Sequence, residues 1–251
     1  MEKNRGFVEI SKYAGMREDL VQAGGGNTSY KISDTEMLIK ASGMHLSEVG
    51  LEEGYCIVNY KIISDFFKQG KNAVDIDEQA GKDLLQKCLV EGKFPSIETF
   101  LHAITGRYTL HTHPIVANII LMRKDAREII QKLFPKSIFV DYAAPGVKLA
   151  LKYYEQLEKT KECNIIFLKN HGMIVSGDSA KEVIEENEKA LLILEEYLHL
   201  DMQRYHQATQ IWQSIGEYEK ILWLTNDINI QKFTIERNLA ECNHRFCPDS
   251  V

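Results

Sequence analysis

The apolar positions along this chain follow two different spacings, one helical and one that alternates residue by residue. Helical spacing predicts helices over Val8–Gln22, Ala73–Val90, Pro114–Met122, Asp125–Phe134, Val147–Leu157 and a long segment that begins after Ser179. Alternating or continuous apolar runs predict strands near Tyr30, over Met37–Ala41, Tyr55–Ile63, around Thr109, and over Ile138–Tyr142, Asn164–Leu168 and Met173–Val175. Between Phe94 and His111 we expect one short helix, with Ser96 as its N-cap.

The order of these elements predicts an α/β fold. Strands and helices alternate irregularly and several strands form hairpins, which favours a mixed or antiparallel sheet covered by helices over a purely parallel, doubly wound sheet. The pattern weakens after about His206. We therefore expect the main domain to span residues 1–208, and residues 209–251 to form a helical C-terminal extension that packs on that domain or at a subunit interface.

Composition narrows the classes of function. The 251 residues carry a formal net charge of −6, which does not favour a nucleic-acid partner. The first residues, Met1–Arg5, lack the apolar run of a signal peptide, and the most apolar stretch, Pro114–Met122, is too short to span a bilayer. The five cysteines form no paired framework, as in reducing compartments. We expect a cytoplasmic protein with no nucleic-acid or membrane partner.

The candidate chemistry centres on the sequence His111-Thr112-His113-Pro114. Side chains alternate between the two faces of a strand, so His111 and His113 point the same way. Two imidazoles side by side on a rigid strand supply two of the three protein ligands of a catalytic metal site. Pro114 then ends the strand and can open the next helix.

A third imidazole is expected from His171, which follows an apolar strand and precedes Gly172. Three histidines with one open coordination position are typical of catalytic zinc, whereas a lone histidine is more often a hydrogen-bonded structural residue. The remaining histidines have no other candidate metal ligand at a comparable spacing. We therefore expect them to be hydrogen-bonded structural residues: His45, His102, His199, His206 and His244.

Polar groups upstream can complete such a site. Glu98 lies one short helix before the two strand histidines and can move a proton beside a metal, although a glutamate in a first helical turn also favours the helix dipole. The glycine run Gly24–Asn27, the Ser42-Gly43 turn and Ser96 can present N–H and hydroxyl groups to an anion. The alternative is three ordinary tight turns.

Together these segments resemble the class II aldolase/adducin family, most closely its rhamnulose-phosphate and fuculose-phosphate aldolase-like members. The matching segments, in order, are Gly25-Gly26-Asn27-Thr28-Ser29, Ala41-Ser42-Gly43, Pro95-Ser96-Ile97-Glu98 with His102, His111-Thr112-His113-Pro114 and Asn170-His171-Gly172. They span most of residues 8–208, and the tail lies outside the resemblance.

The resemblance implies a divalent metal, Zn²⁺ or another such as Mn²⁺ or Co²⁺, bound by His111, His113 and His171. It implies Glu98 as the catalytic acid/base, and a substrate phosphate held by Gly26, Asn27, Ser42, Gly43 and Ser96. The implied reaction is aldol cleavage or formation in a sugar phosphate or similar hydroxy-carbonyl compound through a metal-bound ene-diolate. The implied structure has three layers, a central, mostly antiparallel sheet between helices, assembled as a homotetramer.

Two departures from the family pattern leave alternatives open. The second small hydroxyl residue that often precedes the glutamate is Ile97 here, which weakens the phosphate prediction. The tyrosine that often donates a proton is not identified, with Tyr142, Tyr205 and Tyr218 as candidates. The same three histidines and glutamate also suit a sugar-phosphate 4-epimerase, a dehydratase or a keto-acid phosphate decarboxylase. A non-catalytic, adducin-like domain would be expected to lose them.

Overall fold

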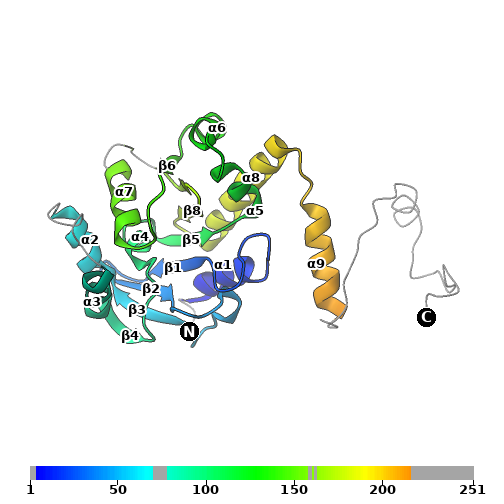
Figure 1. The fold of residues 1–251 in the computed structure, drawn as a ribbon. Helices are drawn as coiled ribbons and strands as arrows, with labels where there is room; N and C mark the ends of the chain where they lie inside the picture. Colours follow the sequence, from blue (N-terminus) through cyan, green and yellow to red (C-terminus); the bar gives the residue numbers. More distant parts are fainter. Residues whose placement is uncertain (1–3, 70–77, 158–159, 161–162, 216–251) are drawn as a thin grey trace, which may run out of the picture. The chain divides into compact units, whose positions relative to one another are not determined.

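The structure is a computed structural model, which describes residues 4–69, 78–157, 160 and 163–215 (Figure 1). The chain divides into two compact units, residues 1–200 and residues 201–251. In the second unit the structure describes one helix, α9 (Gln203–Ile215). The predicted boundary at residue 208 and the predicted packing of the C-terminal extension stay predictions.

The first unit is built on a sheet of eight strands in the order β4-β3-β2-β1-β5-β8-β7-β6. Every neighbouring pair is antiparallel except β6 and β7, which are parallel. This confirms the α/β class with a mostly antiparallel sheet. The strands are β1 (Asn27–Lys31), β2 (Glu36–Lys40), β3 (Tyr55–Asn59), β4 (Leu89–Gly92), β5 (Tyr108–Thr112), β6 (Ile138–Val140), β7 (Ile165–Leu168) and β8 (Gly172–Gly177).

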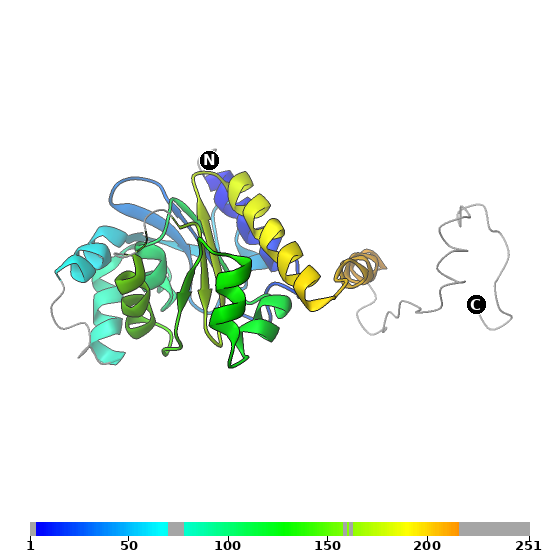
Figure 2. The ribbon, with the colours of Figure 1, turned by 90° about the horizontal axis from the view of Figure 1, so that it is seen from above.

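Helices cover both faces of this sheet, as the view along the sheet in Figure 2 shows. One face, here called the α8 face, is covered by α1, α5 and α8; the other, the α4 face, is covered by α2, α4 and α7. The predicted three-layer arrangement is therefore confirmed. The helices of the first unit are α1 (Arg5–Gly15), α2 (Tyr60–Lys68), α3 (Glu78–Cys88), α4 (Thr99–Ala103), α5 (Ile115–Leu121), α6 (Ala126–Leu133), α7 (Val147–Leu157) and α8 (Ala180–Leu198).

The apolar core lies on both sides of the sheet because successive strand residues point to opposite faces. In β2, Met37 and Ile39 join a large cluster on the α4 face, whereas Leu38 packs with Phe7 and Tyr30 on the α8 face. The sheet is therefore buried on both sides, and a polar side chain that points from it into either layer needs a partner or a function.

Two of the predicted elements are wrong in part. The first helix ends at Gly15, not at Gln22. The strand predicted over Tyr55–Ile63 ends at Asn59, and α2 begins at the next residue. In this segment the alternating spacing of β3 runs directly into a helical spacing that buries Ile63 and Phe67, so the apolar run alone did not mark the boundary.

The ends of two later helices are also defined by the structure. The helix predicted over Ala73–Val90 is described from Glu78 to Cys88, its first residues lie outside the described part, and Leu89 opens β4. The long last helix of the unit ends at Leu198, because His199 takes a left-handed conformation with φ 53°. Among the described helices, none is long and apolar enough to cross a membrane.

Candidate metal centre

The two strand histidines lie at the centre of the sheet. β5 is paired with β1 on one side and with β8 on the other, and His111 lies opposite Asn27 and Ile174. Ile174 belongs to the cluster on the α4 face, so His111 points to that face, and His113 follows with the same parity. The His111 side chain is fully buried. The predicted alternation therefore places both rings under the helices of one layer.

The turn between β7 and β8 supplies the third ring. Asn170 takes a left-handed conformation with φ 54°, which asparagine tolerates, and the His171 N–H donates to the Leu168 carbonyl at 3.1 Å. The next residue, Gly172, passes so close to β5 that a Cβ there would lie 2.2 Å from the Thr112 carbonyl oxygen. Only glycine allows this approach, which brings His171 to the end of β5.

The carboxylate comes from the start of α4. Glu98 is the N-cap residue of this helix, and Ser96 lies in the preceding turn, so the predicted N-cap at Ser96 is wrong. The Ser96 carbonyl accepts from the Thr99 N–H and its hydroxyl from the Glu98 N–H, which fixes a turn before the helix begins. Glu98 makes no side-chain cap and its carboxylate reaches the histidines instead.

Four ligating groups converge at this point. The Nε2 atom of His111 lies 3.1 Å from Nε2 of His113, 3.3 Å from Nε2 of His171 and 3.1 Å from Oε1 of Glu98. The four ligand atoms all lie within 4.8 Å of one another. Nitrogens bound tetrahedrally to zinc at about 2.0–2.1 Å lie about 3.3–3.4 Å apart, so the observed spacing fits one ion between them.

The four groups influence one another's protonation. The Nδ1 atom of His111 lies 3.0 Å from the Met173 carbonyl oxygen, which can only accept, so Nδ1 carries a proton and Nε2 is the atom directed to the centre. Burial opposes the charged form of His111, but Glu98 outweighs it and raises the pKa of this imidazole, so a metal would displace a proton from Nε2. Burial lowers the pKa of His113 to about 3, and the charge of His111 acts in the same direction. Burial opposes ionisation of Glu98, but His111 and His171 outweigh it and hold the pKa of this carboxyl well below its usual value.

Asn27 links this group to the glycine turn. Its side chain is fully buried, and neither Oδ1 nor Nδ2 has a hydrogen-bond partner among the described residues. Its place opposite His111 puts it on the α4 face. Gly26, with φ 73°, packs so tightly that a Cβ would lie 3.0 Å from the His111 carbonyl oxygen. The turn thus delivers an unpaired amide beside the imidazoles.

Two serines lie on neighbouring segments. A bridge between Ala41 and Pro95 brings the Ser42-Gly43 turn beside Ser96. The Ser42 N–H already donates to the Phe94 carbonyl at 2.9 Å, so what this turn can offer an anion is the Ser42 hydroxyl and the N–H of Gly43. The structure thus brings Ser42 and Gly43 beside Ser96, which lies two residues before Glu98.

One charged residue near the site was missed. Lys40 is only 3% exposed, and its Nζ donates to the Met44 carbonyl at 2.8 Å and to the Gly24 carbonyl at 3.4 Å. Burial lowers its pKa, while the charges of Glu98 and Glu48 oppose that shift. A cation is thus held between the glycine turn and the Ser42-Gly43 turn. The signal was present in the sequence, as a lysine inside an otherwise apolar strand.

Both candidate tyrosines that lie in the described part of the chain have exposed side chains. Tyr142 is 57% exposed after β6, and Tyr205 is 66% exposed in the second unit. Tyr218 lies outside the described residues, as does His244. Among the other histidines, His102 is fully buried and its Nδ1 lies 2.7 Å from the Ser29 hydroxyl. Burial lowers the pKa of His102 to about 3.

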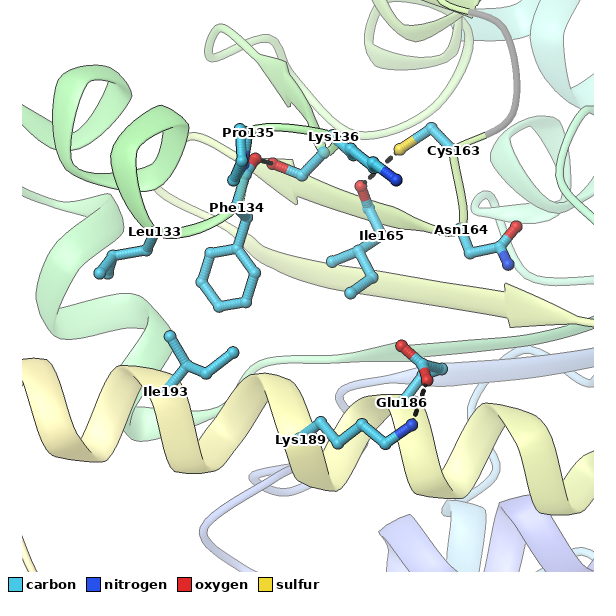
Figure 3. Close-up of a pocket in the computed structure, with 11 residues that line it drawn as sticks. Leu133, Phe134, Pro135, Lys136, Cys163, Asn164, Ile165, Glu186, Lys189 and Ile193 are labelled. Carbon is cyan, nitrogen blue, oxygen red and sulfur yellow. Dashed lines mark hydrogen bonds and ion pairs between the residues drawn. The ribbon is translucent and has the colours of Figure 1, made fainter.

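Among the described residues of the first unit, two cavities bear on where a substrate could bind. One of about 430 Å³ lies on the α8 face between α8 and the end of α6, where Phe134, Ile165 and Ile193 face each other (Figure 3). It shares no residue with the predicted site. The other, of about 520 Å³, is lined by Ser42 and Ser96 among others, so of the two it is the one that adjoins the candidate site.

Comparison with known proteins gives the same fold. The N-terminal class II aldolase domain of a conserved protein from Thermoplasma acidophilum matches with a TM-score of 0.68 and 26% identity, over 76% of this chain and 92% of that chain. YgbL from Klebsiella pneumoniae, a putative aldolase/epimerase/decarboxylase, matches with a TM-score of 0.57 and 17% identity, over 78% and 88%. A sugar-phosphate aldolase from Thermotoga maritima matches with a TM-score of 0.53 and 17% identity, over 79% and 97%.

No curated protein matches the chain. The sequence profile described as "Class II Aldolase and Adducin N-terminal domain" matches residues 5–198, which is most of the first unit. The chain belongs to the class II aldolase and adducin family.

Proposed function

We propose that this protein is a divalent-metal-dependent aldolase that cleaves or forms a carbon–carbon bond in a sugar phosphate or similar hydroxy-carbonyl compound. The observation that carries the proposal is the convergence of three imidazole Nε2 atoms and one carboxylate within 4.8 Å. A non-catalytic domain has no need of four ligating groups that converge at metal-binding distances. The fold shared with the Thermotoga maritima sugar-phosphate aldolase supports the same reading.

His111, His113 and His171 would hold the metal. Three nitrogen donors suit zinc, and manganese or cobalt are the alternatives. When bound, the ion supplies a Lewis acid that stabilises negative charge developing on a carbonyl oxygen of the substrate. The hydrogen bond from Nδ1 of His111 to the Met173 carbonyl keeps its Nε2 lone pair directed to the centre.

Glu98 is the proposed acid/base. In cleavage the base removes the proton of a substrate hydroxyl, that carbon becomes the carbonyl carbon of the released aldehyde, and the electron pair of the broken bond passes to the other fragment. Glu98 is ionised and 9% exposed, so it can accept this proton without competition from bulk water. The same carboxyl can later return a proton to carbon.

The anionic end of the substrate is assigned to Gly26, Asn27, Ser42, Gly43 and Ser96. The unpaired amide of Asn27 supports this, because a buried polar group without a partner costs stability unless a ligand pairs with it. Lys40 adds a buried positive charge beside the same turns. Ile97 supplies no hydroxyl, so this end of the site has fewer donors than the rhamnulose- and fuculose-type pattern.

Further features of the proposal concern assembly and location. We propose a homotetramer with sites at subunit interfaces, in which a neighbouring subunit supplies the proton-donating tyrosine. The main domain would end at residue 208, and the C-terminal extension would pack on it or at an interface. The protein would act in the cytoplasm on a small molecule.

The decisive experiment is a screen of ketose phosphates and keto-acids with added zinc, manganese or cobalt, read by mass spectrometry. Cleavage gives two smaller products, whereas loss of water, loss of carbon dioxide or isomerisation would identify a dehydratase, a decarboxylase or an epimerase. With a substrate in hand, Glu98→Gln should lower kcat by about 10²–10⁴-fold and keep the metal. Glu91→Gln, on the exposed β4 strand, is the matched control.

Two results would count against catalysis of this kind. One is the absence of turnover for every compound and metal, which would favour the adducin-like alternative. The other is full activity in Glu98→Gln, which would remove the carboxylate from the reaction.

A further inference from the structure

The cavity of about 520 Å³ beside Ser42 and Ser96 is mostly apolar. Its volume lies within the range of about 300–1,000 Å³ that is usual for small-molecule sites. It lies where the segment before α4 meets α3 and α7, and its apolar wall consists of Leu85, Phe94, Pro95, Ile97, Phe100 and Val147. A phosphate group alone would leave these side chains uncovered.

Two of the wall residues are large and exposed. Phe94 is 39% and Ile97 is 43% exposed, although both belong to the segment that carries Ser96 and Glu98. A Cβ at Gly146 would lie 3.0 Å from the Ile97 side chain, so Ile97 rests against this glycine at the cavity wall. Ile97 therefore lies at the boundary between the polar residues Ser96 and Glu98 and the apolar wall of the cavity.

The charged groups of this cavity leave one cation without a counterion. Lys82 pairs with Glu78 at 2.7 Å. Lys148 also lines the cavity, and it forms no ion pair with any residue in the described part of the chain. An acidic group on a ligand would complement it.

We propose that the non-reacting end of the substrate extends past Ser42 and Ser96 into this cavity as an apolar segment that ends in an acidic group near Lys148. The proposal rests on the proposed function, because the metal centre has to hold the reacting end. It narrows the substrate to hydroxy-carbonyl compounds that carry an aliphatic or aromatic substituent with a terminal acid. The phosphate or other anion assigned to Ser42 and Ser96 then lies midway along the ligand, and the acidic group near Lys148 is a second negative charge.

Hydroxamates test this without knowledge of the substrate, since their two oxygens chelate divalent metals. The zinc-loaded full chain is titrated by calorimetry with alkyl hydroxamates from acetohydroxamate to octanohydroxamate. Each methylene buried in the cavity should raise the affinity by about fourfold until the cavity is filled. The monohydroxamate of octanedioic acid should bind more tightly than octanohydroxamate, and Lys148→Gln should remove that difference.

A cavity-filling variant tests whether the alkyl chain of the ligand lies in this cavity. Gly81 lines the cavity, and a Cβ there would lie 3.6 Å from Val147, which is ordinary contact. Gly81→Leu should abolish the dependence on chain length and leave acetohydroxamate binding unchanged. Gly81→Ala is the control for the loss of glycine, and thermal unfolding shows whether each variant is folded.

The outcomes separate the two proposals. If acetohydroxamate binds but longer chains bind no better, the cavity proposal is overturned and the metal centre stands. If the affinity for hydroxamates still rises with the length of the alkyl chain in folded Gly81→Leu, the alkyl chain binds elsewhere and the proposal is also overturned. If Gly81→Leu does not fold, the Lys148→Gln comparison decides. If acetohydroxamate does not bind at all, the proposed function itself fails.

Discussion

The metal end and the anion end of the candidate site differ in whether their polar groups have partners. At the metal end, the side chains of His111, His113, His171 and Glu98 contact one another. At the anion end, the amide of Asn27 has no partner among the described residues. The first end holds its groups through mutual contacts, whereas the second keeps a polar group free for a ligand. The two ends should therefore respond differently to substitution.

The largest effect is expected at the metal end. His111→Ala removes the ring that contacts both other imidazoles and the carboxylate, so zinc affinity should fall by more than about 100-fold, since loss of an outer partner alone costs about 10–100-fold. Competition with a chelator measures this. His199→Asn, at a left-handed helix end that suits asparagine, should keep the metal. Unchanged affinity in His111→Ala would show that the ring is not a ligand.

The anion end should lose binding without losing stability. In Asn27→Ala, affinity for inorganic phosphate should fall by about 10–100-fold, because a hydrogen bond to a charged group is lost. The melting temperature should not fall, because the amide has no partner in the free protein. Calorimetry and thermal unfolding measure the two quantities.

Thr112→Val is the matched control for Asn27→Ala. The Thr112 hydroxyl is also buried without a partner, but strand alternation places it on the α8 face, the side on which Thr28 contacts Ser11. Its removal should leave phosphate affinity unchanged. Equal losses in the two variants would mean that Asn27 acts through packing.

A third effect concerns a contact between α4, which begins after Glu98, and β1, which begins at Asn27. His102 of α4 is bonded to Ser29 of β1, and burial lowers the pKa of His102 to about 3, against about 6.5 in the unfolded chain. Between these values the unfolded chain binds a proton that the folded chain does not, so stability falls as the pH falls from 6.5 towards 3. The contribution is at most about 1.4 kcal/mol per pH unit.

The measurement for His102 is the free energy of unfolding of metal-free protein across this pH range. His102→Gln should flatten the slope relative to the wild type by up to that amount. An identical slope in both proteins would show that His102 is protonated in the folded state.

The smallest effect is expected for Ile97→Ser, which should change phosphate affinity at the anion end but not zinc content at the metal end. Ile97→Ser restores a hydroxyl next to Ser96, so phosphate affinity should rise by about 2–10-fold, the range expected for one hydrogen bond. Zinc content should not change. Ile97→Ala separates the new hydroxyl from the loss of bulk, and a rise of the same size in Ile97→Ala would attribute the gain to space alone.

Local patterns predicted the shared face of the two strand histidines better than the structure around them. The shared face of His111 and His113 follows from strand alternation, which depends on no other segment. The fold class followed from the order of elements. In contrast, the statistical preference of serine for N-cap positions placed the helix start at Ser96, whereas the chain first forms a turn and begins α4 at Thr99. Local propensity does not register that turn.

What the sequence could not supply depends on pairing between distant strands. The burial of Asn27 beside His111 results from the register of β1 against β5, which no local pattern encodes. The same holds for Lys40, whose partners Gly24 and Met44 come from two separate turns. The end of β3 at Asn59 was missed because alternating and helical spacings meet there without a glycine or proline between them.

The central position of β5 has a consequence for the order of events during synthesis. Its neighbours β1 and β8 come from opposite ends of the first unit, and His171 precedes β8 directly. A nascent chain that has not yet emerged past residue 177 therefore cannot hold the complete set of ligands. Long-range pairing of this kind forms late and slowly, so metal uptake at this centre would follow it. A bound ion would then stabilise the finished sheet by mass action, so that metal supply would set how much newly made protein stays folded.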